Sequence, residues 1–192
     1  MLEIKEVKKE RCYDGFLKID RYHFQQEKPD GEWTTEFTRE VVLRRNAVAV
    51  LIHDPINDLL LFTRQFRPGA YTQDEPWIYE MVAGLLDSEF EDKEQAIMRE
   101  VKEEAKIDTI ENIQLISSYY PSCGSCTEKV FLYYANAELS NLEKWGGAPE
   151  EDEIIEIITI PVETAFEWQT NGLIGTANGH VALNWLKNTL QK

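Results

Sequence analysis

The segment 84–107 constrains this chain more than any other part of its sequence. Its middle reads Arg-Glu-Val-Lys-Glu-Glu, so Glu100, Glu103 and Glu104 stand within five residues. In a helix, residues four apart share one face and residues three apart flank it, so these carboxylates can converge on one point. Apolar residues at helical spacing supply the opposite face. The segment predicts an amphipathic helix over 92–105 that buries one face and presents carboxylates on the other.

Such a carboxylate cluster has two interpretations. Acidic runs on helices are often solvated surfaces, and this chain is rich in Glu throughout. Alternatively, a cation lies between the charges, because Mg²⁺ and Mn²⁺ take oxygen ligands and join protein carboxylates to substrate phosphates. The context favours the metal, since an apolar strand-like stretch ends at Ala83-Gly84 before the helix and Arg99 precedes the acidic run.

The spacing of Gly, Arg-Glu, Glu-Glu and an apolar residue over 84–107 resembles the Nudix hydrolase signature. Two departures lie at its ends. The loop before Glu91 is one residue longer, and Lys106 stands where the family has Gly. A Gly would suit a left-handed helix end, and a Lys can take this place at modest backbone cost while complementing the helix dipole. The metal-facing helix is intact, so the resemblance implies a metal-dependent hydrolase.

The remaining elements alternate in type. Apolar runs and helical spacing predict a series of strands followed by two C-terminal helices. We expect strands over 47–52, 59–63, 77–82, 113–120, 129–137 and 154–160, and helices over 162–169 and about 181–190. With the helix over 92–105, this order predicts an α/β fold of Nudix type, an α/β/α sandwich with a mixed sheet.

The N-terminal part has a different pattern. Residues 15–25 and 33–44 alternate apolar and polar positions around a Lys-Pro-Asp-Gly-Glu turn, which predicts an antiparallel β region. We therefore expect two parts: an N-terminal β region over 1–45, for dimerisation and pocket formation, and a Nudix hydrolase domain over 46–192.

Charge and hydropathy exclude some classes of protein. The net charge of −15 argues against a nucleic-acid binder, because phosphate backbones are held mainly by Lys and Arg. No apolar run reaches membrane-spanning length and the N-terminus lacks a signal-peptide pattern, so we expect a cytoplasmic protein without a membrane partner. Cys123-x-x-Cys126 lacks the two further ligands of a structural zinc site, so free thiols are expected.

Outside the signature, several stretches resemble the ADP-ribose pyrophosphatase branch of the family. They are Arg39-Glu40, Asp54-Pro55, Gln65-Phe66-Arg67 and residues 76–84. The resemblance implies hydrolysis of ADP-ribose to AMP and ribose 5-phosphate. It also implies a homodimer in which the N-terminal region of one subunit helps to build the nucleotide pocket of the other. One departure is Cys123, at a position where this branch usually has Pro.

The same resemblance assigns a metal site. Glu100, Glu104 and the carbonyl oxygen of Ala83 would hold Mg²⁺ or Mn²⁺, and Glu103 would join or support them. For Arg99 the family role is an ion pair that holds a catalytic Glu in its rotamer; a solvent-exposed arginine is the alternative.

The general base and the substrate ligands are further expectations. Glu151 or Glu153, in the late acidic loop, would deprotonate the attacking water, with Glu103 and Glu128 as the next candidates. We interpret Gly146-Gly147 as the flexible part of this loop.

Candidates for substrate binding lie elsewhere in the chain. Arg39 and Arg67 are candidates for the phosphates or the nucleotide, because a guanidinium pairs with phosphate and stacks on bases. Glu128 is a further candidate substrate ligand, and Phe16 stands where the family stacks its adenine.

Three other functions stay open at this point. The chain could hydrolyse GDP-mannose or another nucleotide sugar, since such relatives share several of these stretches. It could be a non-catalytic ADP-ribose sensor, although such a domain is expected to lose the metal-binding Glu residues. It could also be an acidic interaction domain.

Overall fold

The computed structural model describes residues 1–148 and 152–191. It divides into two compact units. Unit 1 comprises Met1–Asn46 and Tyr120–Lys129, and unit 2 comprises Ala47–Tyr119 and Val130–Lys192. The N-terminal part of unit 1 ends at Asn46, one residue after the expected boundary at residue 45. The sequence did not indicate that the short segment Tyr120–Lys129 belongs with the N-terminal region.

Unit 2 is built on a mixed sheet of eight strands within its described residues. The strands are β4 (Ala47–Asp54), β5 (Leu59–Phe66), β6 (Trp77–Glu80), β7 (Val82–Leu85), β8 (Glu111–Tyr119), β9 (Val130–Asn136), β10 (Trp145–Gly146) and β11 (Ile155–Pro161). Their order is β10-β11-β5-β4-β9-β8, while β6 pairs with β5 and β7 pairs with β4. β4 and β9 run parallel, and this pair makes the sheet mixed.

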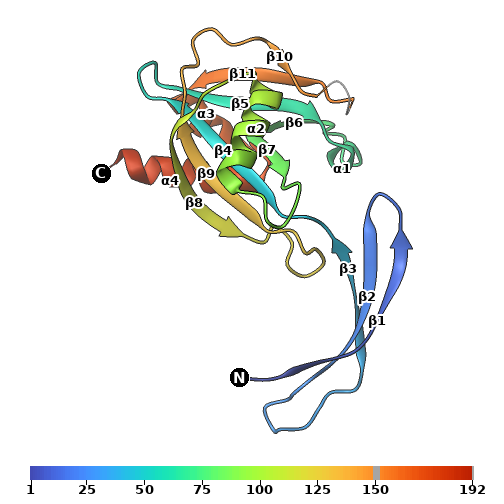
Figure 1. Cartoon of the computed structure of the whole chain (residues 1–192). Helices are drawn as coiled ribbons and strands as arrows, with labels where there is room; N and C mark the ends of the chain where they lie inside the picture. Colours follow the sequence, from blue (N-terminus) through green and yellow to red (C-terminus); the bar gives the residue numbers. More distant parts are fainter. Residues whose placement is uncertain (149–151, 192) are drawn as a thin grey trace. The chain divides into compact units, whose positions relative to one another are not determined.

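Helices cover both faces of this sheet (Figure 1). They are α2 (Lys93–Ala105) on one face and α3 (Val162–Thr170) and α4 (Ala177–Leu190) on the other, while the single turn α1 (Pro68–Tyr71) buries no residue. Successive side chains of a strand point to opposite faces. Accordingly, Val50 of β4 shares one core cluster with Ile97 of α2. Leu51 shares the other with Ala165 of α3 and Leu183 of α4. The predicted α/β/α sandwich is confirmed.

The predicted strand over 77–82 is wrong in one respect. The segment forms two strands, which are separated at the buried residue Met81. The break occurs because β6 pairs with β5, whereas β7 pairs with β4. The short helix α1 was not predicted; it is a single turn that begins at Pro68. No helix among the described residues is long and apolar enough to cross a membrane.

Unit 1 contains a three-stranded antiparallel sheet in the order β1-β2-β3. Its strands are β1 (Ile4–Asp14), β2 (Lys18–Gln26) and β3 (Phe37–Leu43). The β2–β3 pairing confirms the predicted antiparallel β region. β1 was not predicted, because ten of its eleven side chains are exposed and it carries no apolar alternation.

Candidate active site

Helix α2 carries the predicted carboxylates, and both of its ends are capped. At the start, the side chain of Asp92 accepts two backbone N–H groups of the first turn, at 3.1 and 3.0 Å. At the end, Lys106 has φ 56 and ψ 28, the left-handed conformation expected of the Gly it replaces. Its Nζ donates to the carbonyl oxygens of Glu103 and Gly147, both at 3.0 Å. Lys106 therefore caps the helix and ties its end to a later loop.

Two of the three signature carboxylates are buried where α2 meets β7. Glu100 is 9% exposed and Glu104 is 3% exposed. Glu104 Oε2 accepts the backbone N–H of Ala83 at 3.4 Å. In an antiparallel strand the N–H and C=O of one residue point to the same side, so the Ala83 carbonyl is expected to face α2 as well. A Cβ added at Gly84 would overlap the Glu100 carboxylate, so this close approach requires glycine.

The electrostatics of this pair favour a cation. Burial raises the pKa of Glu104 well above its ordinary value of 4.5, and the charges of Glu100 and Glu153 raise it further. Burial also raises the pKa of Glu100, against the opposing charge of Arg99. Mg²⁺ is commonly held by one or two carboxylates together with water and substrate phosphates. The buried pair fits such an ion, which would compensate charge that the protein leaves unbalanced.

Glu103 lies beside the buried pair. Its side chain is 45% exposed, and its Oε2 is 3.6 Å from Nη1 of Arg99. In the part of the chain that the structure describes, no three His, Cys, Asp or Glu side chains form a ready-made metal cluster. The sequence suggested three converging carboxylates, but the structure brings together two. A role for Glu103 in metal binding stays a prediction.

Arg99 connects Glu100 to the loop that precedes α2. Its Nη1 lies 2.6 Å from Glu100 Oε1, while its Nη2 donates to the Leu85 carbonyl at 3.2 Å and lies 3.4 Å from Glu91. The resemblance implied an ion pair between Arg99 and a catalytic Glu, and the structure pairs Arg99 with Glu100. A positioning role for Arg99 stays a prediction.

The two glycines of the late loop serve a close approach to α2. A Cβ at Gly146 would overlap the Glu104 carbonyl, and the Gly147 N–H donates to the Glu103 carbonyl at 3.0 Å. Gly147 also has φ 102, which disfavours other residues. The sequence had suggested that these glycines let the loop swing. In the structure Gly146 ends β10 and both glycines lie against the end of the helix.

Of the two candidate bases, the structure describes one. Glu153 follows this anchored segment, and its backbone N–H donates to the Ala148 carbonyl at 3.3 Å. Its charge is among the causes that raise the pKa values of Glu100 and Glu104. Glu153 therefore acts electrostatically on the buried pair. Glu151 lies outside the described residues.

Arg67 is fixed near the same carboxylates. It pairs bidentately with Glu80, with Nε at 2.6 Å from Oε1 and Nη2 at 3.3 Å from Oε2. Burial lowers the pKa of Arg67, but the charges of Glu80, Glu104 and Glu153 outweigh this effect. The sequence indicated Arg67 but missed Glu80, its partner across the β5–β6 pair.

The remaining predicted residues belong to unit 1. Phe16 is fully exposed between β1 and β2, which excludes a core role within this chain. The guanidinium of Arg39 lies 5.0 Å from the ring centre of Phe37. Glu128 forms an ion pair of 2.9 Å with Arg44 and is 15% exposed. Their contribution to a substrate site stays a prediction.

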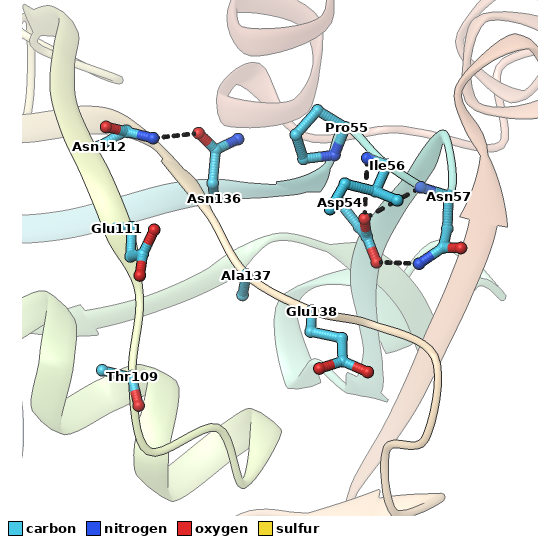
Figure 2. A pocket seen from close by; sticks show the side chains of 10 residues that line it. All are labelled: Asp54, Pro55, Ile56, Asn57, Thr109, Glu111, Asn112, Asn136, Ala137 and Glu138. Carbon is cyan, nitrogen blue, oxygen red and sulfur yellow. Dashed lines mark hydrogen bonds between the residues drawn. The ribbon is translucent and has the colours of Figure 1, made fainter.

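Unit 2 also contains a separate pocket (Figure 2). Its Asp54 carboxylate accepts hydrogen bonds from the Asn57 side chain and from backbone N–H groups that include that of Leu139; they lower its pKa to about 2. Asp54 thus stabilises a turn. None of the lining residues is a predicted site residue: Asp54, Pro55, Ile56, Asn57, Thr109, Glu111, Asn112, Asn136, Ala137 and Glu138.

Comparison with known protein families identifies the family to which the chain belongs. The NUDIX domain model matches residues 43–175, which include the whole β7–α2 region. The chain belongs to the NUDIX family. The resemblance noted in the sequence is therefore confirmed, and the protein is a Nudix hydrolase.

Several curated proteins match this Nudix chain over nearly its full length. The ADP-ribose pyrophosphatase of Escherichia coli strain K12 is 30% identical, covering 96% of this chain and 88% of that protein. That of Haemophilus influenzae is 28% identical, covering 96% and 86%. A GDP-mannose pyrophosphatase of Yersinia enterocolitica is 27% identical, covering 90% and 89%. The crystal structure of an ADP compounds hydrolase has a TM-score of 0.71 at 17% identity, covering 98% of this chain and 95% of that one, and shares the fold.

Proposed function

We propose that this Nudix hydrolase cleaves the diphosphate linkage of ADP-ribose and releases AMP and ribose 5-phosphate. The observation that carries the proposal is the pair of buried carboxylates, Glu100 and Glu104, at the junction of β7 and α2. A pair of this kind suits a divalent cation that also binds substrate phosphates. The ADP-ribose pyrophosphatases that match 96% of the chain support the choice of substrate.

We expect Mg²⁺ as the cation, with Mn²⁺ as the alternative. Glu100, Glu104 and the Ala83 carbonyl would hold it, with Glu103 at the edge of the site. When bound, such an ion neutralises the diphosphate and lowers the pKa of a bound water. Arg99 would keep Glu100 in place for this role, because its guanidinium already pairs with that carboxylate at 2.6 Å.

Two further groups would act on the reactants. Glu153 would accept a proton from the attacking water, because its charge already acts on both buried carboxylates. Glu151 is the second candidate for this role. Arg67 would orient a phosphate with the guanidinium edge that Glu80 leaves available.

A nucleotide sugar such as GDP-mannose is the second candidate substrate. GDP-mannose pyrophosphatases match the chain at 27% identity, and Cys123 replaces the Pro usual in the ADP-ribose branch. The choice of substrate is tested by measuring the release of nucleoside monophosphate with Mg²⁺ and with Mn²⁺. The substrates compared are ADP-ribose, GDP-mannose, UDP-glucose and NADH. We expect ADP-ribose to give the highest kcat/KM. A tenfold preference for GDP-mannose, about 1.4 kcal/mol, would overturn the assignment.

We also propose a homodimer located in the cytoplasm. Unit 1 leaves Phe16 fully exposed and Trp33 40% exposed, which supports burial against a second copy. The three cysteines are free thiols, as is usual in a reducing compartment. Light scattering at micromolar concentration should give twice the chain mass, and a monomeric mass would contradict the dimer.

A further inference from the structure

We infer that Cys123 and Cys126 form a reversible redox pair, closing an intrachain disulfide in the segment Tyr120–Lys129. This segment belongs to unit 1. Neither cysteine has a part in the hydrolysis proposed above. The inference rests on the geometry of one turn, on the different exposure of the two thiols and on the way the turn is fixed to strand β3.

The turn brings the two cysteines to one side. The Ser122 carbonyl accepts the N–H of Ser125 at 3.1 Å and that of Cys126 at 2.9 Å, so the chain makes a single helix-like turn. Residues three apart in such a turn are neighbours, with Cβ atoms about 5–6 Å apart. In a disulfide the Cβ atoms are about 3.5–4.5 Å apart, so the turn must bring these two Cβ atoms closer before the bond can form. A Cβ placed at Gly124 would meet no atom within 4 Å, so the turn has room to tighten as the bond forms.

The exposure of the two thiols assigns them different roles. Cys123 is exposed, whereas Cys126 is partly buried and its Sγ accepts the Glu128 N–H at 3.5 Å. With hydrogen peroxide as oxidant, the Cys123 thiolate attacks one peroxide oxygen, releasing water and giving a sulfenic acid. The Cys126 thiolate then attacks that sulfur and displaces the oxygen as a second water. Each sulfur loses one electron, the peroxide gains two, and a thiol reductant reverses the reaction.

The turn is also tied to strand β3 at its C-terminal end. The Val42 N–H of β3 donates to the Ser125 carbonyl at 2.8 Å, and the Thr127 N–H donates to the Val42 carbonyl at 3.1 Å. Thr127 Oγ1 bonds the backbone of Arg44 twice, at 2.8 Å each. Because these bonds hold the Cys126 end of the turn on β3, only the Cys123 end has to move for the two sulfurs to meet.

A metal is a weaker explanation of the pair. Structural zinc needs four ligands. Throughout residues 1–148 and 152–191, no three His, Cys, Asp or Glu side chains are arranged to hold a metal ion. A disulfide needs only the two sulfurs that the turn supplies.

Thiol mapping of the full chain tests the inference. The reduced protein is treated with hydrogen peroxide, its remaining thiols are alkylated, and tryptic peptides 107–129 and 12–18 are weighed. We expect the first peptide to lose two hydrogens and both alkyl labels together, and to regain both labels after reduction by dithiothreitol. Cys12, an exposed thiol on β1, is the matched control and should keep its label.

Two variants complete the test. In Cys126→Ser, the Cys123 sulfenic acid should persist and be trapped by dimedone, whereas the wild type should give no such adduct. Cys12→Ser should behave as the wild type. Loss of only one label in the wild type, oxidation of Cys123 to the sulfinic acid, or bonds between chains would each overturn the inference.

Discussion

The two units reach stability by different means. In unit 2 the eight side chains of β4 are all buried, and apolar clusters fill both faces of the sheet. In unit 1, which the structure describes completely, Asp20 is the single buried residue, and it is charged. Unit 2 is therefore held by apolar burial, whereas unit 1 depends on backbone pairing, partly buried aromatic rings and ion pairs.

The difference explains where the acidic site is located. Burying two carboxylates raises their pKa values and costs folding free energy, so it requires a rigid and strongly stabilised support. Helix α2 has this support, because its apolar face packs in the core cluster that contains Val48 and Val50. A sheet such as that of unit 1 could not hold an unbalanced charge in place.

The largest effect is expected from Glu104→Gln. Removing this charge should lower kcat at least about a thousandfold with Mg²⁺, since several kcal/mol of metal-dependent stabilisation is lost. Without metal the variant should be more stable than the wild type, because a neutral amide suits the buried position. Glu94→Gln, in the first turn of α2, is the matched control. Near-normal turnover would remove Glu104 from the metal site.

The same substitution changes the pH dependence of stability. The folded-state pKa of Glu104 is raised above 4.5, so above pH 4.5 the folded chain binds more protons than the unfolded chain. Without metal, this group should make stability fall as pH rises from 4.5 towards the raised pKa. Thermal melts in EDTA between pH 5 and pH 8 should show a smaller fall in Glu104→Gln, and equal slopes would contradict the raised pKa.

A pair of aromatic truncations tests the contrast between the units directly. Phe62 is completely buried in unit 2, so Phe62→Ala should cost about 3–5 kcal/mol of unfolding free energy. Phe24 of β2 is only partly buried and stacks on Tyr22 at 5.6 Å, so Phe24→Ala should cost about 1 kcal/mol. Denaturant midpoints provide the measurement. Equal costs would mean that unit 1 has a core in solution, which a second copy could supply.

Glu153→Gln tests whether Glu153, which follows the Gly146-Gly147 segment that lies against α2, is the general base. Losing a general base should lower kcat by about 10²- to 10⁴-fold while the stabilisation by Mg²⁺ is retained. Glu143→Gln, an exposed acidic position just before β10, is the control. Weaker stabilisation by Mg²⁺ in Glu153→Gln would instead make Glu153 a metal ligand.

Gly84→Ala tests the close approach of β7 to α2. The new Cβ would overlap the Glu100 carboxylate and displace it, and a displacement of about 1 Å can cost about a hundredfold in kcat. Gly175→Ala is the matched control, because a Cβ there meets no atom within 4 Å. Unchanged kcat in Gly84→Ala would show that Glu100 can move without loss of activity.

The smallest effect concerns the ion pairs of unit 1. Arg11 and then Lys9 lower the pKa of Asp20, and the Lys9 pair is 2.9 Å long. The resulting stability is present above the ordinary value of 3.8 and is lost as pH falls below it. The protection factors of β2 amides, which are exchange rates corrected for the intrinsic rate at each pH, should therefore fall in acid in the wild type, and less so in Asp20→Asn. An equal response in both would place the acid sensitivity elsewhere.

The sequence predicted the elements with strong local patterns. Helix α2 was expected over 92–105 and is observed as Lys93–Ala105, with Asp92 as its cap. Apolar spacing and capping residues encode such a helix within its own segment. The left-handed conformation at Lys106 was also expected, because the position is one where the family has Gly.

What the sequence missed depends on contacts between distant segments. β1 pairs with β2 through backbone hydrogen bonds, with Lys9 opposite Tyr22. Because this pairing does not depend on apolar side chains, β1 needs no apolar alternation and its sequence shows none. The Arg67–Glu80 pair exists only because β5 and β6 lie side by side. Gly146 and Gly147 suggest flexibility in sequence, and only the structure shows that they lie against α2.

The discontinuity of unit 1 has a consequence for protein engineering. The chain passes between the units three times, so removing Met1–Asn46 would not excise unit 1. Such a truncation would leave Tyr120–Lys129 without the strand to which it is hydrogen bonded, namely Val42 and its neighbours. A chimaera that exchanges the N-terminal region with that of a relative must therefore carry both pieces from the same parent.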